Sequence, residues 1–195
     1  MTVIIDYNTG NLFSLMSALE RIGTEYKVTS DPQDILSADS VILPGVGEAS
    51  NAMSELRQRG LEKIVPIIKA PVLGICIGMQ IMCSSSEESD TDCLGIFPNK
   101  VSRLRGPGIK IPHMGWNNVE NTKSPLFTGI QDGAYFYFVH SFAPECNELT
   151  AATTEYGSVF SSALSEKNFY GTQFHPEKSG EIGEKILRNF IEINF

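Results

Sequence analysis

The stretch Pro71-Val-Leu-Gly-Ile-Cys76-Ile-Gly-Met-Gln80 decides the fold, because it joins a short apolar run to a helical pattern through a single thiol. Small residues at 74 and 78 flank that thiol and indicate a sharp strand-to-helix turn, a nucleophile elbow that exposes the sulfur. The N-terminus of the following helix favours the thiolate form of Cys76. We therefore expect Cys76 to be a nucleophile at the end of a strand. A buried and inert cysteine is the alternative that this stretch alone leaves open.

On the N-terminal side of the elbow, short β-rich runs alternate with helical patterns, which is typical of a parallel sheet with crossover helices. Strands are expected at 3–6, 26–29 and 40–43. Helices are expected at 12–22, from Asp31-Pro32 onward, and at 48–59. Asn11 is the predicted N-cap of the first helix, and Gly23 and Gly60 are the predicted stops.

On the C-terminal side, the pattern changes to strands and turns. Residues 84–92 are polar and acidic and are predicted to form a loop. From Leu94 to Gln173 we expect an antiparallel portion added to the parallel core. Its predicted turns are Gly106-Pro-Gly108, Asn117-Asn118 and Asp132-Gly133. Helical spacing returns from 182 to 191, with Ser179 as the predicted cap, and no linker divides the chain, so we expect a single domain over 1–195.

Composition excludes several classes of partner. The formal net charge of −8 and the pI near 4.9 disfavour nucleic acid and anionic membranes. The charge-free segment 70–86 contains glycines and serines and is too interrupted to be a membrane span. The first six residues have no basic lead and are predicted to be a strand rather than a signal peptide. The four cysteines have neither paired metal spacing nor disulfide density, so we expect a reducing cytoplasm and no metal.

A nucleophilic thiol needs a base and a group that orients this base. Among three histidines, only His175 has a suitably placed carboxylate, in His175-Pro-Glu177 after the strand-like run 170–174. Glu177 would accept from one ring nitrogen while the other faces the sulfur. The alternative is a surface ion pair. His140, in the aromatic strand 135–142, is more simply a hydrogen-bonded core histidine, and His113 has no clear role.

An acyl transfer also needs donors for the oxyanion. Pro44-Gly-Val-Gly47 directly follows a predicted strand, at the sheet edge where ligand crevices form, and its N–H groups can converge on the sulfur with that of Ile77. Such loops often only turn the chain. Cys83 is expected to pack in the core, and Cys93 and Cys146 receive no role.

Together these pieces resemble the triad-type (class I) glutamine amidotransferases, over nearly the whole chain. Within that superfamily the sequence is most similar to the glutaminase subunits of imidazole glycerol phosphate synthase. The matching segments are Asp6-Tyr-Asn-Thr-Gly-Asn-Leu12, Pro44-Gly-Val-Gly47, Pro112-His-Met-Gly-Trp-Asn117, Tyr137-Phe-Val-His-Ser-Phe142 and His175-Pro-Glu-Lys-Ser179. The resemblance implies a flavodoxin-like, three-layer α/β fold with an open, mostly parallel sheet, crossover helices and an added antiparallel portion.

The resemblance also implies the chemistry. L-glutamine would be hydrolysed to glutamate and ammonia through a γ-glutamyl thioester, with no cofactor. The implied catalytic residues are Cys76 as nucleophile, His175 as base and then acid, and Glu177 as its orienter. The implied oxyanion donors are the N–H groups of Val46 and Ile77, and the implied glutamine-binding residues are Gly47, Gln80 and Glu88.

The family delivers its ammonia to a (β/α)8-barrel cyclase, so the resemblance implies a heterodimer. That partner makes imidazole glycerol phosphate and aminoimidazole carboxamide ribotide in histidine biosynthesis. The residues implied to face it are Asn11, Trp116, Tyr137 and Lys178. Asn8-Thr9 and Met82-Cys-Ser-Ser-Ser86 depart from the family pattern, which bears on partner contacts and glutamine affinity more than on the reaction.

Three other functions remain open at this point. A glutaminase subunit serving pyridoxal phosphate, anthranilate or aminodeoxychorismate synthesis would share the chemistry but not the acceptor. A non-enzymatic flavodoxin-like module would carry Cys76 only as a reactive thiol. A cysteine peptidase would need an extended substrate groove, of which the sequence has no sign.

Overall fold

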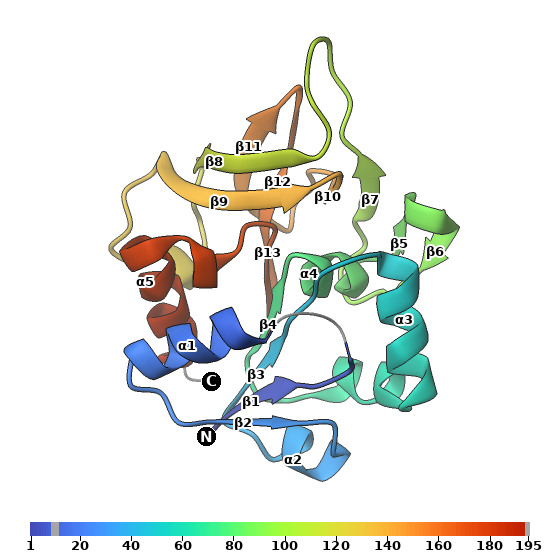
Figure 1. Cartoon of the computed structure of the whole chain (residues 1–195), viewed down its shortest axis with the longest axis vertical. Helices are drawn as coiled ribbons and strands as arrows, with labels where there is room; N and C mark the ends of the chain where they lie inside the picture. The colour runs from blue at the N-terminus through green and yellow to red at the C-terminus, as the bar shows by residue number, and fades with distance from the viewer. Residues whose placement is uncertain (9–11, 194–195) are drawn as a thin grey trace.

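The computed structural model describes residues 1–8 and 12–193 and is built around a seven-stranded sheet of order β11-β12-β13-β4-β3-β1-β2 (Figure 1). The parallel strands are β1 (Thr2–Ile5), β2 (Tyr26–Thr29), β3 (Ser40–Leu43), β4 (Val72–Ile75) and β13 (Phe169–Thr172). The antiparallel edge consists of β11 (Thr150–Tyr156) and β12 (Ser158–Glu166). This mostly parallel sheet with an antiparallel addition confirms the predicted fold class.

Helices cover both faces of this sheet. The helix bounds are α1 (Phe13–Arg21), α2 (Pro32–Leu36), α3 (Ala49–Gln58), α4 (Ile77–Met82) and α5 (Gly180–Ile191). Figure 1 shows α1 and α5 on one side of the sheet and α3 and α4 on the other. All four residues of β1, β3, β4 and β13 are buried, as expected for parallel strands covered on both faces.

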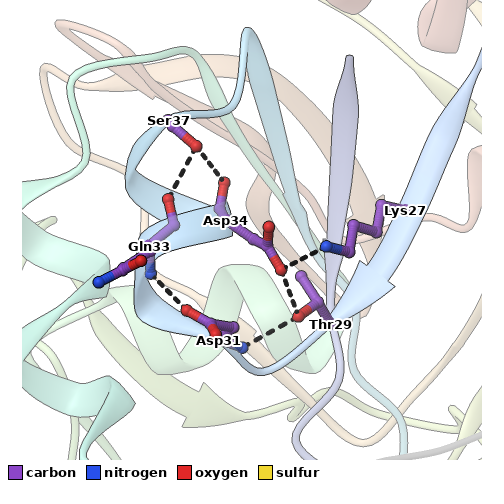
Figure 2. Close-up of polar contacts among 6 residues, drawn as sticks. All are labelled: Lys27, Thr29, Asp31, Gln33, Asp34 and Ser37. Atoms are coloured by element: carbon purple, nitrogen blue, oxygen red, sulfur yellow. Dashed lines mark hydrogen bonds and ion pairs between the residues drawn. The ribbon is translucent and has the colours of Figure 1, made fainter.

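The short helix α2 begins as its sequence predicts (Figure 2). Asp31 is the N-cap, and its carboxylate accepts a 2.7 Å hydrogen bond from the N–H of Gln33. Pro32 occupies the first turn, where its missing N–H has no cost. Asp34 accepts from the Thr29 hydroxyl at 3.1 Å and pairs with Lys27 at 2.7 Å, which fastens α2 to the end of β2.

The predicted ends of α1 and α3 are confirmed. Gly23 and Gly60 follow these helices with φ values of 75° and 68°, a left-handed conformation that favours glycine. Asn11, the predicted cap of α1, lies outside the described residues. Ser179 directly precedes α5, but its side chain makes no capping bond, so the prediction of a Ser179 cap is wrong in its chemistry.

One prediction of irregular structure is wrong in part and another is wrong. Residues 84–92 contain a turn at Glu88–Asp90, but it is flanked by strands β5 (Ser85–Ser86) and β6 (Thr91–Asp92), in a sheet of order β10-β7-β5-β6 with β7 (Lys100–Arg103) and β10 (Phe142–Pro144). Only Ser86 and Thr91 are buried in those two short strands, so no apolar alternation announces them. Asn117-Asn118 lies inside β8 (His113–Val119) rather than in a turn, where the two residues pair with Phe136 and Tyr135 of the neighbouring antiparallel strand.

The β8 strand forms an antiparallel hairpin with β9 (Ala134–His140). This hairpin lies above the end of the sheet where β4 gives way to α4 (Figure 1). The buried apolar side chains of hairpin, sheet and helices form one continuous cluster. Among the described residues, no helix has the length and apolar character needed to cross a membrane.

Candidate active site

Cys76 occupies the sharp turn between β4 and α4, as the elbow pattern predicts, but it is 4% exposed and lines a cavity rather than lying open to solvent. Its φ and ψ are 54° and −109°, an unfavourable conformation for a residue with a side chain. The backbone N–H of Cys76 donates to the Thr172 carbonyl of β13 at 2.7 Å, and its carbonyl accepts from Gln80 of α4 at 3.0 Å. The strained turn is therefore held from both sides.

The glycines around Cys76 permit close backbone packing. A Cβ on Gly78 would lie 1.9 Å from the Leu43 carbonyl oxygen, and one on Gly74 would lie 2.7 Å from the Met79 nitrogen. A Cβ on Gly45 would lie 2.5 Å from the Gly78 nitrogen. None of these three has a positive φ, so close approach rather than turn conformation requires glycine here. The loop 44–47 thus packs directly against the elbow.

His175 lies beyond β13, the strand adjacent to β4, and is 1% exposed. Its Nδ1 is 2.7 Å from Glu177 Oε1, as the spacing of the two residues predicts. Its Nε2 is buried without a hydrogen bond of standard geometry to a described group. Burial disfavours the imidazolium, but the Cys76 sulfur and the Glu177 carboxylate outweigh it and raise the pKa of His175 to about 10. The sulfur, imidazole and carboxylate thus interact as one unit.

Ser179 holds the histidine backbone in place. Its hydroxyl donates to the His175 carbonyl at 2.7 Å and accepts from the Tyr137 N–H at 3.0 Å. The His175 N–H in turn donates to the Tyr137 carbonyl at 2.9 Å. The side chain expected to cap α5 instead connects the histidine turn to β9.

A cavity of about 380 Å³ opens beside the thiol. Its lining contains Cys76 and His175 together with all the residues predicted for oxyanion and glutamine binding. The lining residues are Val46, Gly47, Cys76, Ile77, Gln80, Glu88, Pro112, Val139, His140, Ser141, Phe142, His175 and Lys178. Segments far apart in the chain therefore meet at the carboxyl end of β4.

Glu88 reaches the cavity from a turn between β5 and β6. Its Oε2 accepts from the N–H of Ala49 at 2.8 Å, at the first residue of α3. Burial raises the pKa of Glu88, while the bond from Ala49 opposes this shift and the nearby Glu48 charge adds to it. One carboxylate oxygen is thus committed to a helix N-terminus.

Gln80 and Gln173 form a buried amide pair beside the thiol. Gln80 Nε2 donates to Gln173 Oε1 and to the Phe142 carbonyl, each at 2.9 Å. Gln173 Nε2 donates to the Cys76 sulfur at 3.6 Å. Sequence reasoning missed Gln173, although a polar residue two positions before His175 at a strand end was the available signal.

Of the predicted partner-facing residues that the structure describes, Lys178 lines the cavity, whereas Trp116 and Tyr137 do not. Trp116 on β8 is 55% exposed and contacts the Tyr137 ring edge-on, with 6.2 Å between centroids. Met114 and Tyr135 of the same hairpin are also exposed. Asn11 lies outside the described residues.

Comparison with known proteins identifies the family of the chain. Residues 3–193 match the family model described as "Glutamine amidotransferase class-I". The chain is 50% identical over 192 residues to "Imidazole glycerol phosphate synthase subunit HisH" of Bacteroides fragilis strain YCH46, covering 97% of this chain and 98% of that protein. It is 49% identical over 193 residues to the HisH subunit of Escherichia coli K12, covering 98% of both.

Solved structures share the fold at lower identity. A putative GMP synthase subunit from Thermoplasma acidophilum superposes with a TM-score of 0.76 at 21% identity, covering 98% of this chain and 92% of that one. A structure titled "glutamine amidotransferase" gives 0.75 at 19% identity, covering 97% of both chains. The chain therefore belongs to the class-I glutamine amidotransferase family and, within it, to the HisH subunits of imidazole glycerol phosphate synthase.

Proposed function

We propose that the protein hydrolyses L-glutamine to glutamate and ammonia with Cys76, His175 and Glu177 as its catalytic residues. The observation that carries this proposal is the oriented unit of sulfur, imidazole and carboxylate at the edge of one cavity. A family member with this unit has the nucleophile, base and orienting group that acyl transfer requires.

In the proposed reaction, the Cys76 sulfur attacks the side-chain amide carbon of glutamine and His175 carries the proton. The tetrahedral intermediate collapses as His175 protonates the departing nitrogen, which releases ammonia and leaves a γ-glutamyl thioester. Water then attacks the thioester, with His175 as base, which releases glutamate and regenerates the thiol. Glu177 keeps Nδ1 protonated so that Nε2 is the nitrogen that exchanges protons.

We assign the oxyanion donors to the N–H groups of Ile77 and Val46. Ile77 is the first residue of α4, so its N–H has no partner within the helix and lies at the positive end of the dipole. Val46 belongs to the loop that packs against the elbow and lines the cavity. Gly47, Gln80 and Glu88 would bind the amino-acid part of glutamine, with the Glu88 carboxylate facing its ammonium group.

We further propose that the ammonia passes to a cyclase subunit with a (β/α)8-barrel fold, in the cytoplasm. The relatives named above are subunits of imidazole glycerol phosphate synthase, which supports a role in histidine biosynthesis. The exposed Trp116 and the neighbouring Tyr137 are the type of residue that anchors an interface, and Lys178 lines the cavity that holds the thiol. Residues 1–195 would act as one glutaminase domain, supported by the continuous core.

The decisive experiment measures glutamate release and cyclase product formation by the complex, with glutamine or with ammonium as nitrogen source. Cys76→Ala should abolish the glutamine-dependent reaction, a loss of at least about a thousandfold, and leave the ammonium-dependent reaction intact. Loss of both reactions would contradict the division of labour between subunits. Activity with a cyclase-free acceptor system instead would favour a glutaminase for another pathway, and no glutamate release from the wild-type complex would favour a reactive-thiol module.

A further inference from the structure

Two buried histidines take no part in the proposed reaction. His113 of β8 and His140 of β9 are register partners across the hairpin and are 3% and 6% exposed. His113 Nδ1 lies 2.9 Å from His140 Nε2. A hydrogen bond between two ring nitrogens needs one donor and one acceptor, so the neighbours of the pair decide which nitrogen carries each proton.

At the His140 end of the pair, the neighbour is the Phe142 carbonyl oxygen, which lies 2.9 Å from His140 Nδ1. A carbonyl only accepts, so His140 carries its proton on Nδ1 and its Nε2 accepts. His113 must then donate from Nδ1, which leaves His113 Nε2 as an acceptor. The His140 end of the pair thus requires the Nδ1–H tautomer on both rings.

At the His113 end of the pair, the neighbour Asn117 independently requires the same Nδ1–H tautomer of His113. Asn117 Nδ2 lies 3.3 Å from His113 Nε2. The orientation of this amide is set by two backbone contacts, because Nδ2 also donates to the Glu155 carbonyl at 3.0 Å and Oδ1 accepts from the Asn118 N–H at 2.9 Å. Reversing the amide would break both, so a donor faces His113 and its Nε2 must accept.

The surroundings keep both rings neutral. Burial lowers the pKa of His113 to about 4. Burial, opposed by the bond to Phe142 and reinforced by His113 and His175, lowers the pKa of His140 to about 3. The Tyr156 ring stacks on His113 with 4.0 Å between centroids, and the Phe160 ring lies 5.1 Å from His140. A second proton on His113 Nε2 would face the Asn117 Nδ2 donor, and a second proton on His140 Nε2 would face the His113 Nδ1 donor.

The Phe142 carbonyl connects this pair to the thiol. It accepts from His140 and also from Gln80 Nε2, which donates to Gln173 as well. Gln173 in turn donates to the Cys76 sulfur. A continuous path of hydrogen bonds therefore runs from Asn117 of the hairpin to the nucleophile, and donors from both sides of this path converge on the Phe142 carbonyl.

We propose that His113 and His140 are positioning residues of the glutaminase site: a neutral pair that holds the Phe142 carbonyl against Gln80 and so keeps Gln173 donating to Cys76. This inference rests on the proposed glutamine hydrolysis. The pair acts through the two glutamines, and His140 also lines the cavity beside the thiol. Under this proposal, glutaminase activity depends on which ring nitrogen donates and which accepts, rather than on the volume of the rings.

The kinetic test compares His113→Leu with His113→Asn in the complex with the cyclase. Leucine fills space but leaves His140 Nε2 without a donor, whereas asparagine places an amide N–H near the position of Nδ1. We expect kcat/KM for glutamine to fall about tenfold or more in His113→Leu and to stay within about threefold of wild type in His113→Asn. Equal activity of the two folded variants, or a fully active His113→Leu, would overturn the proposal.

A second measurement needs no variant that must fold. Ring ¹⁵N shifts of the wild-type protein should show His113 and His140 neutral and protonated on Nδ1 from about pH 6 to 8, where a free histidine titrates. An Nε2–H tautomer on either ring, or titration in this range, would overturn the proposal. Failure of the proposed function is distinguishable, because the wild-type complex itself would then release no glutamate.

Discussion

The sheet edge and the β8–β9 hairpin shift the pKa of their buried histidines in opposite directions. At the sheet edge, His175 interacts with a sulfur and a carboxylate, and its pKa is raised to about 10. In the β8–β9 hairpin, His113 and His140 contact each other, amides, carbonyls and aromatic rings, no described carboxylate offsets their burial, and their pKa values are lowered to about 4 and 3. All three are buried, so burial alone does not determine the charge of a histidine. The charged neighbours do.

The largest effect should come from removing the charge that distinguishes the sheet edge. Glu177→Gln keeps the size of the side chain but removes a cause of the raised His175 pKa, so this pKa should fall. We expect kcat for glutamine hydrolysis to drop by about 10² to 10⁴. Histidine ¹⁵N titration and steady-state kinetics of the complex measure the two effects, and an unchanged rate would remove Glu177 from the catalytic unit.

The next effect concerns packing, which is tighter at the sheet edge than at the hairpin turn. Gly78→Ala places a Cβ against the Leu43 carbonyl and should destabilise the protein by about 3 kcal/mol or more. The matched control is Gly133→Ala before β9. No described heavy atom lies within 4 Å of the added Cβ there, but the φ of this residue is 82°. Its cost should be about 1 kcal/mol. Urea unfolding compares the two, and equal losses would show that the close contact at Gly78 costs no more than the left-handed conformation at Gly133.

The pH dependence of stability separates the two histidine environments by sign. The lowered pKa values of His113 and His140 make their contribution present above about pH 6.5 and progressively lost as the pH falls toward 4 and 3. The raised pKa of His175 makes its contribution complete below about pH 6.5 and lost as the pH rises toward 10. Each group contributes a slope of at most about 1.4 kcal/mol per pH unit.

Urea unfolding across these pH values tests the signs. His140→Gln removes one group that binds a proton on unfolding, so the acid-side slope should become shallower in this variant while the alkaline side is unchanged. A steeper acid slope in His140→Gln than in wild type would contradict the assignment of a neutral pair.

The smallest effect on the folded subunit belongs to the outer face of the hairpin. Trp116→Ala should change its unfolding free energy by less than about 0.5 kcal/mol, because the side chain is 55% exposed. Affinity for the cyclase should fall about tenfold or more. Val159→Ala on β12, with a 56% exposed side chain, is the matched control and should leave affinity unchanged. Equal affinities of the two variants would place the interface elsewhere.

Sequence reasoning succeeded where a local pattern has one physical solution. The elbow at Cys76, the helix start at Asp31-Pro32 and the stops at Gly23 and Gly60 each depend on a few adjacent residues, and the structure has all of them. It failed at residues 84–92 and at Asn117-Asn118, where polar residues enter strands because a neighbouring strand supplies their partners. A polar strand of this kind has no periodicity to read.

The sequence by itself determined the parallel α/β architecture, the nucleophile elbow and the His175–Glu177 pair, because all three depend on the order of residues over short distances. Only the tertiary structure decided that Gln173 reaches the sulfur, that Ser179 joins His175 to β9, and that His113 and His140 share one hydrogen bond. These contacts join segments brought together by strand order and hairpin register, and the donor and acceptor roles within them depend on neighbours that no short stretch of sequence contains.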